Sequence, residues 1–312
     1  MEIGLVLGPW GMSPDTFVSV IKEAEALGFS SFYAGDHFFV GPQLDSPEPY
    51  LLFTLAARET SRIRFGPLVT PVMFRSPWEL GKWAAQLDLL SGGRFVMGLG
   101  VGWSEAEHRA YGIAYPPLKE RFDRLDEAIQ LMRAMWGPGP ASFAGRYYQL
   151  EGVDALPKPA AGRPPIMIGG GGEQRTLGLA AKYAAEWSAP GLMPEAFKRK
   201  LEILAGHCDR VGRDPATIRH SMLSMGPIGA TQEAIEAATQ LQYSRIPPPS
   251  PMSMADYRAS MKQRGAIVGG AGEVLESLGG LAEAGVDEVL FVYGPGVPEF
   301  LASTVLGAAR RL

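Results

Sequence analysis

The sequence predicts one α/β domain over residues 1–312, a (β/α)8 barrel of the TIM type with insertions. Three observations support this fold. Short apolar stretches alternate with amphipathic helical patterns, eight such stretches occur, and no shift in composition marks a second domain. Alternation of this kind is typical of a parallel sheet, and eight repeats with right-handed crossovers suggest a closed barrel. The alternative is an open, doubly wound sheet.

Eight apolar segments bounded by glycine, proline or polar residues are the expected strands. In chain order they cover residues 3–7, 29–34, 63–69, 94–99, 164–168, 186–189, 218–225 and 286–292. A barrel carries its chemistry in the loops that follow the strands. The residues after each segment are therefore the first candidates for a functional site.

The expected helices show apolar residues at helical spacing between start and stop signals. Ser13 can cap the first helix and Gly28 can end it. The helix over 118–136 is the clearest, because one face collects the apolar residues Phe122, Leu125, Ile129, Met132 and Trp136. The other expected helices cover residues 50–61, 78–90, 176–183, 196–211, 233–243, 273–283 and the C-terminal residues.

Two segments fall outside the repeating pattern. Residues 137–163 begin with a Gly-Pro-Gly-Pro stop and contain an alternating stretch around Gly145, which predicts a hairpin or loop insertion. Residues 244–256 contain four prolines, which cannot continue a helix. We expect a mobile surface loop there.

Composition excludes several classes of protein. Cys208 is the only cysteine, so a disulfide scaffold is excluded and a reducing compartment is favoured. The net charge of −4 offers no general attraction to nucleic acid or anionic membranes. The N-terminal residues lack the basic region of a secretory signal, and no apolar run is long enough to span a membrane. We expect a cytoplasmic protein with neither nucleic acid nor membrane as a partner.

Asp36 and His37 directly follow the second expected strand. A histidine there can move a proton near neutral pH, and the aspartate can orient it or bind a cofactor hydroxyl. Alternatively, His37 only satisfies local backbone groups. After the third strand, the sequence 66–71 contains a glycine and two prolines, which fits either a bulge or an ordinary loop.

A Gly-x-Gly-x-Gly sequence follows the fourth strand and includes Gly100 and Gly102. Glycines allow a flat ligand to approach the backbone, although this spacing is not a dinucleotide fingerprint. Ser104 can cap a short helix in which Glu105 and Glu107 either interact with the helix dipole or, for Glu105, act at the barrel mouth. Glu105 and His108 have an E-x-x-H spacing that occurs once, so we expect no metal site.

Four consecutive glycines, Gly169–Gly172, lie between the fifth strand and its helix. Backbone N–H groups at a helix start attract an anion, and the alternative is a flexible turn. No metalloprotease, P-loop or nucleophile-elbow motif is present, and no lysine ends an expected strand. These absences suggest a bound organic cofactor. Aromatic residues near the strand ends suggest a partly apolar mouth; they are Trp10, Phe38, Phe39, Phe74 and Trp103.

In combination, these segments resemble the luciferase-like oxidoreductases, particularly the branch that uses the deazaflavin coenzyme F420. The resemblance covers most of the chain and rests on FYAGDHF at 32–38, RIRFGPLVTPVMFRSP at 62–77, SGGRFVMGLGVGWSEAEHRAYG at 91–112, PPIMIGGGGEQRTLGLAAKYAAEWS at 164–188 and AGVDEVLFVYG at 284–294. It implies a luciferase-like TIM barrel that holds the cofactor ring at the strand ends. It also implies a non-prolyl cis peptide within residues 67–69.

The resemblance also implies roles for individual residues. His37 and Glu105 match the active-site histidine and an acid beside the substrate, so they are the catalytic candidates. His108 matches a contact to the cofactor tail, and the glycine run matches a phosphate-binding turn. Pro67 departs from the Gly-Thr that members often have. The cofactor-binding candidates are Asp36, Pro67, Leu68, Val69, Thr70, Gly100, Gly102, His108, Gly169, Gly170, Gly171, Gly172 and Ser188.

The leading hypothesis is an F420-dependent oxidoreductase that transfers hydride between the coenzyme and a small organic substrate. One alternative is a monooxygenase that uses reduced FMN on the same barrel. A second, of another class, is a non-catalytic F420-binding protein. An unrelated barrel such as a sugar isomerase is disfavoured, because metal and lysine sites are absent. Family members are often dimers, so we expect a homodimer.

Overall fold

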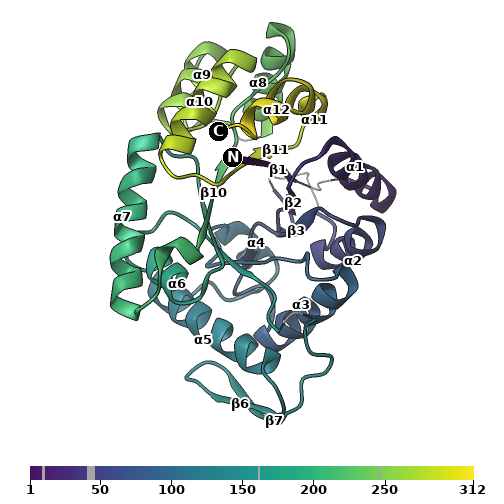
Figure 1. Ribbon diagram of the computed structural model, residues 1–312, viewed down its shortest axis with the longest axis vertical. Helices are drawn as coiled ribbons and strands as arrows, with labels where there is room; N and C mark the ends of the chain where they lie inside the picture. Colours follow the sequence, from purple (N-terminus) through teal and green to yellow (C-terminus); the bar gives the residue numbers. More distant parts are fainter. Residues whose placement is uncertain (9–10, 41–45, 161, 246) are drawn as a thin grey trace.

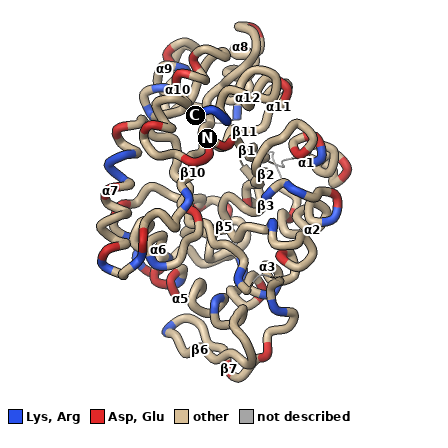
Figure 2. Tube along the Cα trace, viewed as in Figure 1, with Lys and Arg blue, Asp and Glu red and all other residues tan. Residues whose placement is uncertain are grey.

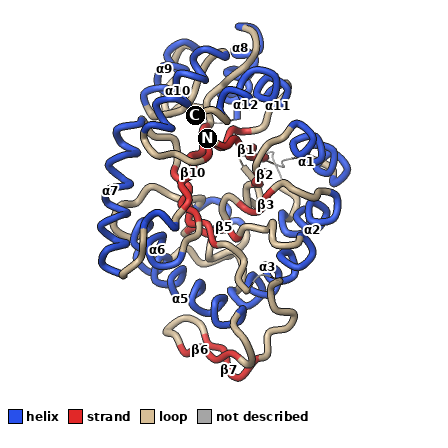
Figure 3. Tube along the Cα trace, in the orientation of Figure 1, coloured by secondary structure: helices blue, strands red, loops and turns tan. Residues whose placement is uncertain are grey.

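The barrel is closed by nine parallel strands among the residues described by the computed structural model, which are 1–8, 11–40, 46–160, 162–245 and 247–312. The strands form a central ring with the helices outside it (Figures 1 and 3). They are β1 (Glu2–Leu7), β2 (Ser31–Ala34), β3 (Arg64–Pro67), β4 (Thr70–Pro71), β5 (Met97–Gly100), β8 (Ile166–Gly169), β9 (Glu186–Ala189), β10 (Arg219–Ser224) and β11 (Glu288–Val292).

The strand order confirms the predicted barrel and excludes an open sheet. The order is β3-β2-β1-β11-β10-β9-β8-β5-β4. In it β1 and β11, the first and last strands along the chain, pair with each other. β3 and β4 lie on one stretch of chain interrupted at Leu68 and Val69. The ring closes because β4 pairs with β5 and because Val96 N donates to Phe65 O at 2.8 Å.

The helices cover the barrel in chain order: α1 (Pro14–Leu27), α2 (Pro49–Glu59), α3 (Pro77–Ser91), α4 (Glu105–Ala110), α5 (Leu118–Trp136), α6 (Thr176–Tyr183), α7 (Pro194–Val211), α8 (Gln232–Arg245), α9 (Met254–Gln263), α10 (Ala271–Glu283), α11 (Val297–Phe300) and α12 (Leu306–Ala309). Their boundaries follow the sequence signals. Ser13 Oγ accepts from Thr16 N at 3.2 Å, and Gly28 ends α1 with a φ of 92°.

The predicted terminal helix is not continuous, because a π-helical turn (Leu301–Val305) separates α11 from α12. The sequence analysis also missed α9. The segment 244–256 is therefore partly helical, since α8 continues to Arg245 and α9 starts at Met254. Ser253 caps α9 by accepting from Asp256 N at 3.1 Å. Ile246, in this segment, lies outside the described residues.

An antiparallel hairpin occupies the segment 137–163 and projects from the barrel beside α5 (Figure 1). It pairs β6 (Ala141–Ala144) with β7 (Gln149–Val153). The carboxylate of Glu127 on α5 accepts hydrogen bonds from two backbone N–H groups in the turn of the hairpin, those of Arg146 at 2.9 Å and Tyr147 at 2.8 Å. This contact attaches the turn of the hairpin to α5.

A cluster of ion pairs fills the end of the barrel where the strands begin. Glu288 is fully buried and accepts from Arg64 Nη2 at 2.7 Å and from Ser31 Oγ at 2.6 Å. Glu186 accepts from the same Arg64 at 3.1 Å, and Arg219 Nη2 lies 3.3 Å from Glu288. Each buried carboxylate thus has an arginine partner, which buried charges require. Polar groups therefore close this end, leaving the opposite, carboxyl end for a functional site.

Candidate functional site

The predicted site residues lie at or just beyond the carboxyl ends of five neighbouring strands. Asp36 and His37 follow β2, and Leu68 and Val69 interrupt the strand formed by β3 and β4. The other candidates end or follow β5, end or follow β8, or lie within β9. Glu105 and His108 lie on α4, the helix that follows β5. Because all these strands are parallel, their carboxyl ends meet at one end of the barrel. Trp10 lies outside the described residues.

His37 and Glu107 are joined by a hydrogen bond of 2.8 Å between Nδ1 and Oε2. The Glu107 side chain is buried, and its Oε1 also accepts from the backbone N–H of Phe38 at 2.6 Å and of Phe39 at 3.3 Å. Burial raises the pKa of Glu107, but the hydrogen bonds from His37, Ser104 and Phe38 outweigh it and hold the pKa below its ordinary value. An ionised Glu107 can only accept, so His37 Nδ1 carries the proton. Nε2 is then the nitrogen left for chemistry.

Glu105, the second catalytic candidate, does not contact His37 in the structure. The Glu105 side chain is 62% exposed and pairs with Arg109 one turn later, at 3.0 Å. Residues two apart on a helix point in nearly opposite directions, so Glu105 faces solvent while Glu107 faces His37. The acid that meets the histidine is therefore Glu107, which the sequence analysis had assigned only to the helix dipole.

Asp36 is bound by protein groups. Its carboxylate accepts from Arg75 at 2.7 and 3.1 Å and from Thr70 Oγ1 at 2.7 Å. Arg75 also binds Glu48 at 2.6 Å, and Tyr50 OH lies 2.8 Å from Thr70 Oγ1. Burial raises the pKa of Asp36, against the opposing effect of Arg75. The contacts of Asp36, a predicted cofactor ligand, and of Thr70 thus tie β4 and Arg75 to the end of β2.

The peptide bond between Leu68 and Val69 is cis, within the range that the resemblance implied. Pro67 lies in β3 opposite Ala34, and Leu68 N donates to Ala34 O at 2.9 Å. The Val69 side chain fills the space that two glycines leave. A Cβ at Gly100 would lie 2.6 Å from Val69 Cγ2, and one at Gly169 would lie 2.8 Å from Cγ1. These glycines, predicted to admit a cofactor, accommodate Val69.

His108 is buried and has one unpartnered nitrogen in the described part of the chain. Nδ1 lies 2.9 Å from Ala114 O, so Nδ1 carries the proton, and Nε2 is an acceptor without a partner. A Cβ at Gly102 would lie 3.5 Å from this Nε2. An unpaired buried polar atom is costly, and a bound ligand can satisfy it.

The glycine turn after β8 is anchored by side chains from two other elements. Trp187 of β9 donates to Gly170 O at 2.8 Å, and Lys200 of α7 donates to Gly171 O at 2.8 Å. Ser188, buried in β9, accepts at its backbone oxygen from Gly170 N at 3.0 Å. Gly172 lies over Thr176, since a Cβ there would be 2.9 Å from Thr176 Oγ1. The turn therefore combines a bare backbone with a lysine, whose Nζ also pairs with Glu173 at 3.3 Å.

Four residues of the candidate site were not predicted to belong to it: Glu107, which was assigned only to the helix dipole, and Arg75, Lys200 and Arg121. Arg121 donates to the carbonyl oxygens of Val101 and Gly102, at 3.1 and 2.5 Å, and thereby fixes the loop after β5. A signal existed only for Glu107, because helical periodicity separates it from Glu105 by about half a turn. The other three act through contacts between distant segments, which a single sequence does not reveal.

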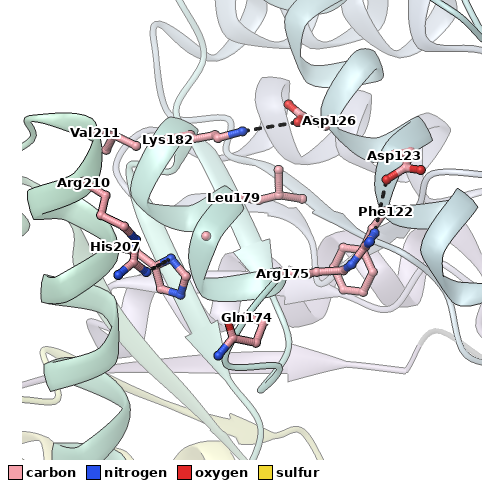
Figure 4. Close-up of a pocket in the computed structure, with 11 residues that line it drawn as sticks. Phe122, Asp123, Asp126, Gln174, Arg175, Leu179, Lys182, His207, Arg210 and Val211 are labelled. Atoms are coloured by element: carbon pink, nitrogen blue, oxygen red, sulfur yellow. Dashed lines mark hydrogen bonds and ion pairs between the residues drawn. The ribbon is translucent and has the colours of Figure 1, made fainter.

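A groove of about 390 Å³ lies away from the strand ends, on the outer surface between α5, α6 and α7 (Figure 4). Its charges are mostly paired, as between Arg175 and Asp123 at 3.2 Å and between Lys182 and Asp126 at 3.4 Å. Acidic and basic residues are likewise interspersed over the outer helices (Figure 2). Within the described residues, no cluster of metal-binding side chains forms and no helix is long and apolar enough to cross a bilayer.

Comparisons with known proteins identify the family and agree with the fold. The sequence profile of the family described as luciferase-like monooxygenase matches residues 2–288. The F420-dependent hydroxymycolic acid dehydrogenase of Mycobacterium tuberculosis is 30% identical over 259 residues, which cover 81% of this chain and 70% of that protein. The F420-dependent glucose-6-phosphate dehydrogenase of Amycolatopsis mediterranei is 32% identical over 188 residues, 59% of this chain and 54% of that protein.

Among solved structures, an F420-dependent secondary alcohol dehydrogenase in complex with an F420-acetone adduct superposes with a TM-score of 0.83 over 99% of both chains. Its sequence identity to this chain is 21%, so this likeness bears on the fold.

Proposed function

The chain belongs to the luciferase-like monooxygenase family, and from this we propose that it is an F420-dependent oxidoreductase acting on a small organic substrate. The naming of its relatives as F420-dependent dehydrogenases supports the choice of coenzyme. The single observation that carries the proposal is the His37–Glu107 pair at the carboxyl end of the barrel.

The residues present fit a long, anionic deazaflavin coenzyme. Leu68 and Val69 would lie beneath its ring, because they interrupt the barrel wall where the resemblance places it. The unpartnered Nε2 of His108 would accept a hydrogen bond from the tail. The turn Gly169–Gly172, next to Lys200, would hold the phosphate. Asp36 would support the coenzyme site indirectly, because its carboxylate holds the side chains of Thr70 and Arg75 in place.

F420 supplies hydride transfer when it is bound. In the oxidative direction, an alcohol carbon gives up a hydride and its hydroxyl gives up a proton. His37 Nε2 takes that proton, and the imidazolium is stabilised by ionised Glu107. In the reductive direction, Nε2 returns the proton to the carbonyl oxygen. Of the two catalytic candidates, His37 is proposed as the proton carrier, with Glu107 as its positioning residue.

Parallel titrations with F420 and FMN test the coenzyme, with tryptophan fluorescence as the readout. Tight F420 binding and weak FMN binding support the proposal. Preference for FMN would favour the monooxygenase, and binding of neither would refute the cofactor assignment. His37→Ala should keep F420 affinity and lose turnover. Tight F420 binding without hydride exchange on any acceptor would indicate a non-catalytic binding protein.

We also propose a homodimer in the cytoplasm. Cys208 is buried and has no cysteine partner, which fits a reducing compartment.

Leu51 on α2 and Leu89 and Leu90 on α3 are exposed, and α2 and α3 pack side by side. Exposed apolar residues on adjacent helices suit an interface between copies. Light scattering of the purified protein measures its molar mass in solution, and a monomeric mass at micromolar concentration would refute the homodimer.

A further inference from the structure

Aromatic rings from the segments after β2, β4 and β5 lie next to His37 in the chain or in contact with its ring. The Trp103 ring lies edge-on to the His37 ring, with centroids 5.5 Å apart. Phe38 stacks on Tyr111 at 4.2 Å and contacts Phe74 at 4.7 Å. We call Phe38, Phe74, Trp103 and Tyr111 the aromatic mouth. It is continuous with the proposed proton carrier, because Phe38 and His37 are adjacent and both are bound by Glu107.

Two of these rings are unusually accessible for their size. Trp103 is 72% exposed and Tyr111 is 56% exposed. The Trp103 backbone is nevertheless held in place, because Tyr115 OH donates to its carbonyl oxygen at 3.2 Å and Arg121 donates to the preceding Gly102 O. A rigid loop that presents a large apolar ring to solvent is typical of a binding surface. Contact with a ligand would remove this apolar area from water.

The arginines on the segments that carry these rings are engaged or directed elsewhere. Arg75 binds Asp36 and Glu48, and its side chain is only 9% exposed. Arg109 pairs with Glu105 on the face of α4 nearly opposite Glu107. Arg121 donates to backbone carbonyls. The aromatic mouth therefore offers ring faces to a substrate, and each arginine of these segments has a partner among the residues that the structure describes.

We propose that the aromatic mouth selects an uncharged substrate with an apolar ring or alkyl chain, which packs on Trp103 while its alcohol or carbonyl oxygen meets His37. This inference rests on the proposed function and adds the substrate class. It separates the two kinds of substrate that the relatives' names suggest, since a phosphorylated sugar needs cations that the aromatic mouth does not supply.

Calorimetric titration of the F420-loaded protein with acetophenone, 2-octanone, acetone and glucose 6-phosphate tests the inference without requiring turnover. We expect acetophenone and 2-octanone to bind more tightly than the other two. Trp103→Ala should weaken acetophenone binding about ten-fold and leave the F420 Kd unchanged. Trp103→Phe should retain most of the affinity. Trp78→Ala is the matched control, because Trp78 is 45% exposed at the start of α3, outside the aromatic mouth, and it should change nothing.

Tighter binding of glucose 6-phosphate than of acetophenone would overturn the inference. So would the absence of binding by both apolar probes to F420-loaded protein, or equal acetophenone affinity in wild type and Trp103→Ala. If Trp103→Ala does not fold, Tyr111→Ala provides the same comparison. Failure of F420 itself to bind would instead refute the proposed function, so the two failures are distinguishable.

Discussion

His37 and Glu107 are hydrogen-bonded at 2.8 Å although 70 residues separate them in the sequence. The contact joins the loop after β2 to α4 through Nδ1 of the histidine. It also shows that two acids on the same short helix lie in different surroundings. Glu107 is buried against the histidine, whereas Glu105 is exposed.

Replacing Glu107 by Gln should lower kcat about 10–100-fold, because a neutral amide stabilises an imidazolium less than a carboxylate does. The Kd for F420 should stay within about two-fold, since the pair handles the substrate proton. Glu105→Gln should have little effect on either quantity. Steady-state kinetics with fluorescence titration measures both variants. A larger loss of kcat in Glu105→Gln than in Glu107→Gln would restore the assignment made from sequence.

Stability should depend on pH through Glu107. Its pKa in the folded protein lies below the ordinary value of 4.5, so the ionised form contributes stability above pH 4.5. That contribution is lost as the pH falls through the lowered pKa. The difference in unfolding free energy between wild type and Glu107→Gln should therefore be present at neutral pH and shrink in acid. Urea titrations at a series of pH values measure it. A difference independent of pH would contradict the assignment.

Gly100→Ala should destabilise the protein by about 1–3 kcal/mol, because the new methyl group would overlap Val69 Cγ2. Adding Val69→Ala should recover part of the loss, since the two side chains compete for one space. Gly206→Ala is a matched control in α7, where a Cβ meets nothing within 4 Å. It should leave stability unchanged or raise it by up to about 1 kcal/mol. Thermal unfolding of wild type, Gly100→Ala, Val69→Ala, the double variant and Gly206→Ala measures these effects, and additive effects of the two single substitutions would contradict the contact.

Glu288→Ala should cost about 3–5 kcal/mol, because it removes the fully buried carboxylate that Arg64 and Arg219 share and leaves buried Glu186 to balance two partly buried arginines. The comparison is Glu59→Ala, which breaks an exposed ion pair with Lys22 and should cost less than about 1 kcal/mol. Chemical denaturation measures both. Similar costs for the two variants would mean that the cluster at the start of the strands does not stabilise the barrel.

Local sequence signals were enough to predict much of this architecture. The eight apolar segments all contain strands, because burial on both faces demands continuous apolar residues. Ser13 and Gly28 bound α1 as expected, since capping is a local interaction. The helix α9 was not predicted, because the prolines within 247–251 indicated a loop and the N-cap residue Ser253 directly after them was overlooked.

Periodicity and chain order follow from local rules, and they were enough to predict the barrel, the strand ends where the candidate site lies and the position of His37 there. The partners that these residues meet follow from the tertiary structure alone. It joined His37 to Glu107, filled the space at Gly100 and Gly169 with Val69, and attached Lys200 to the glycine turn. These contacts join distant segments, and their geometry depends on the closure of the barrel, which no single stretch of sequence contains.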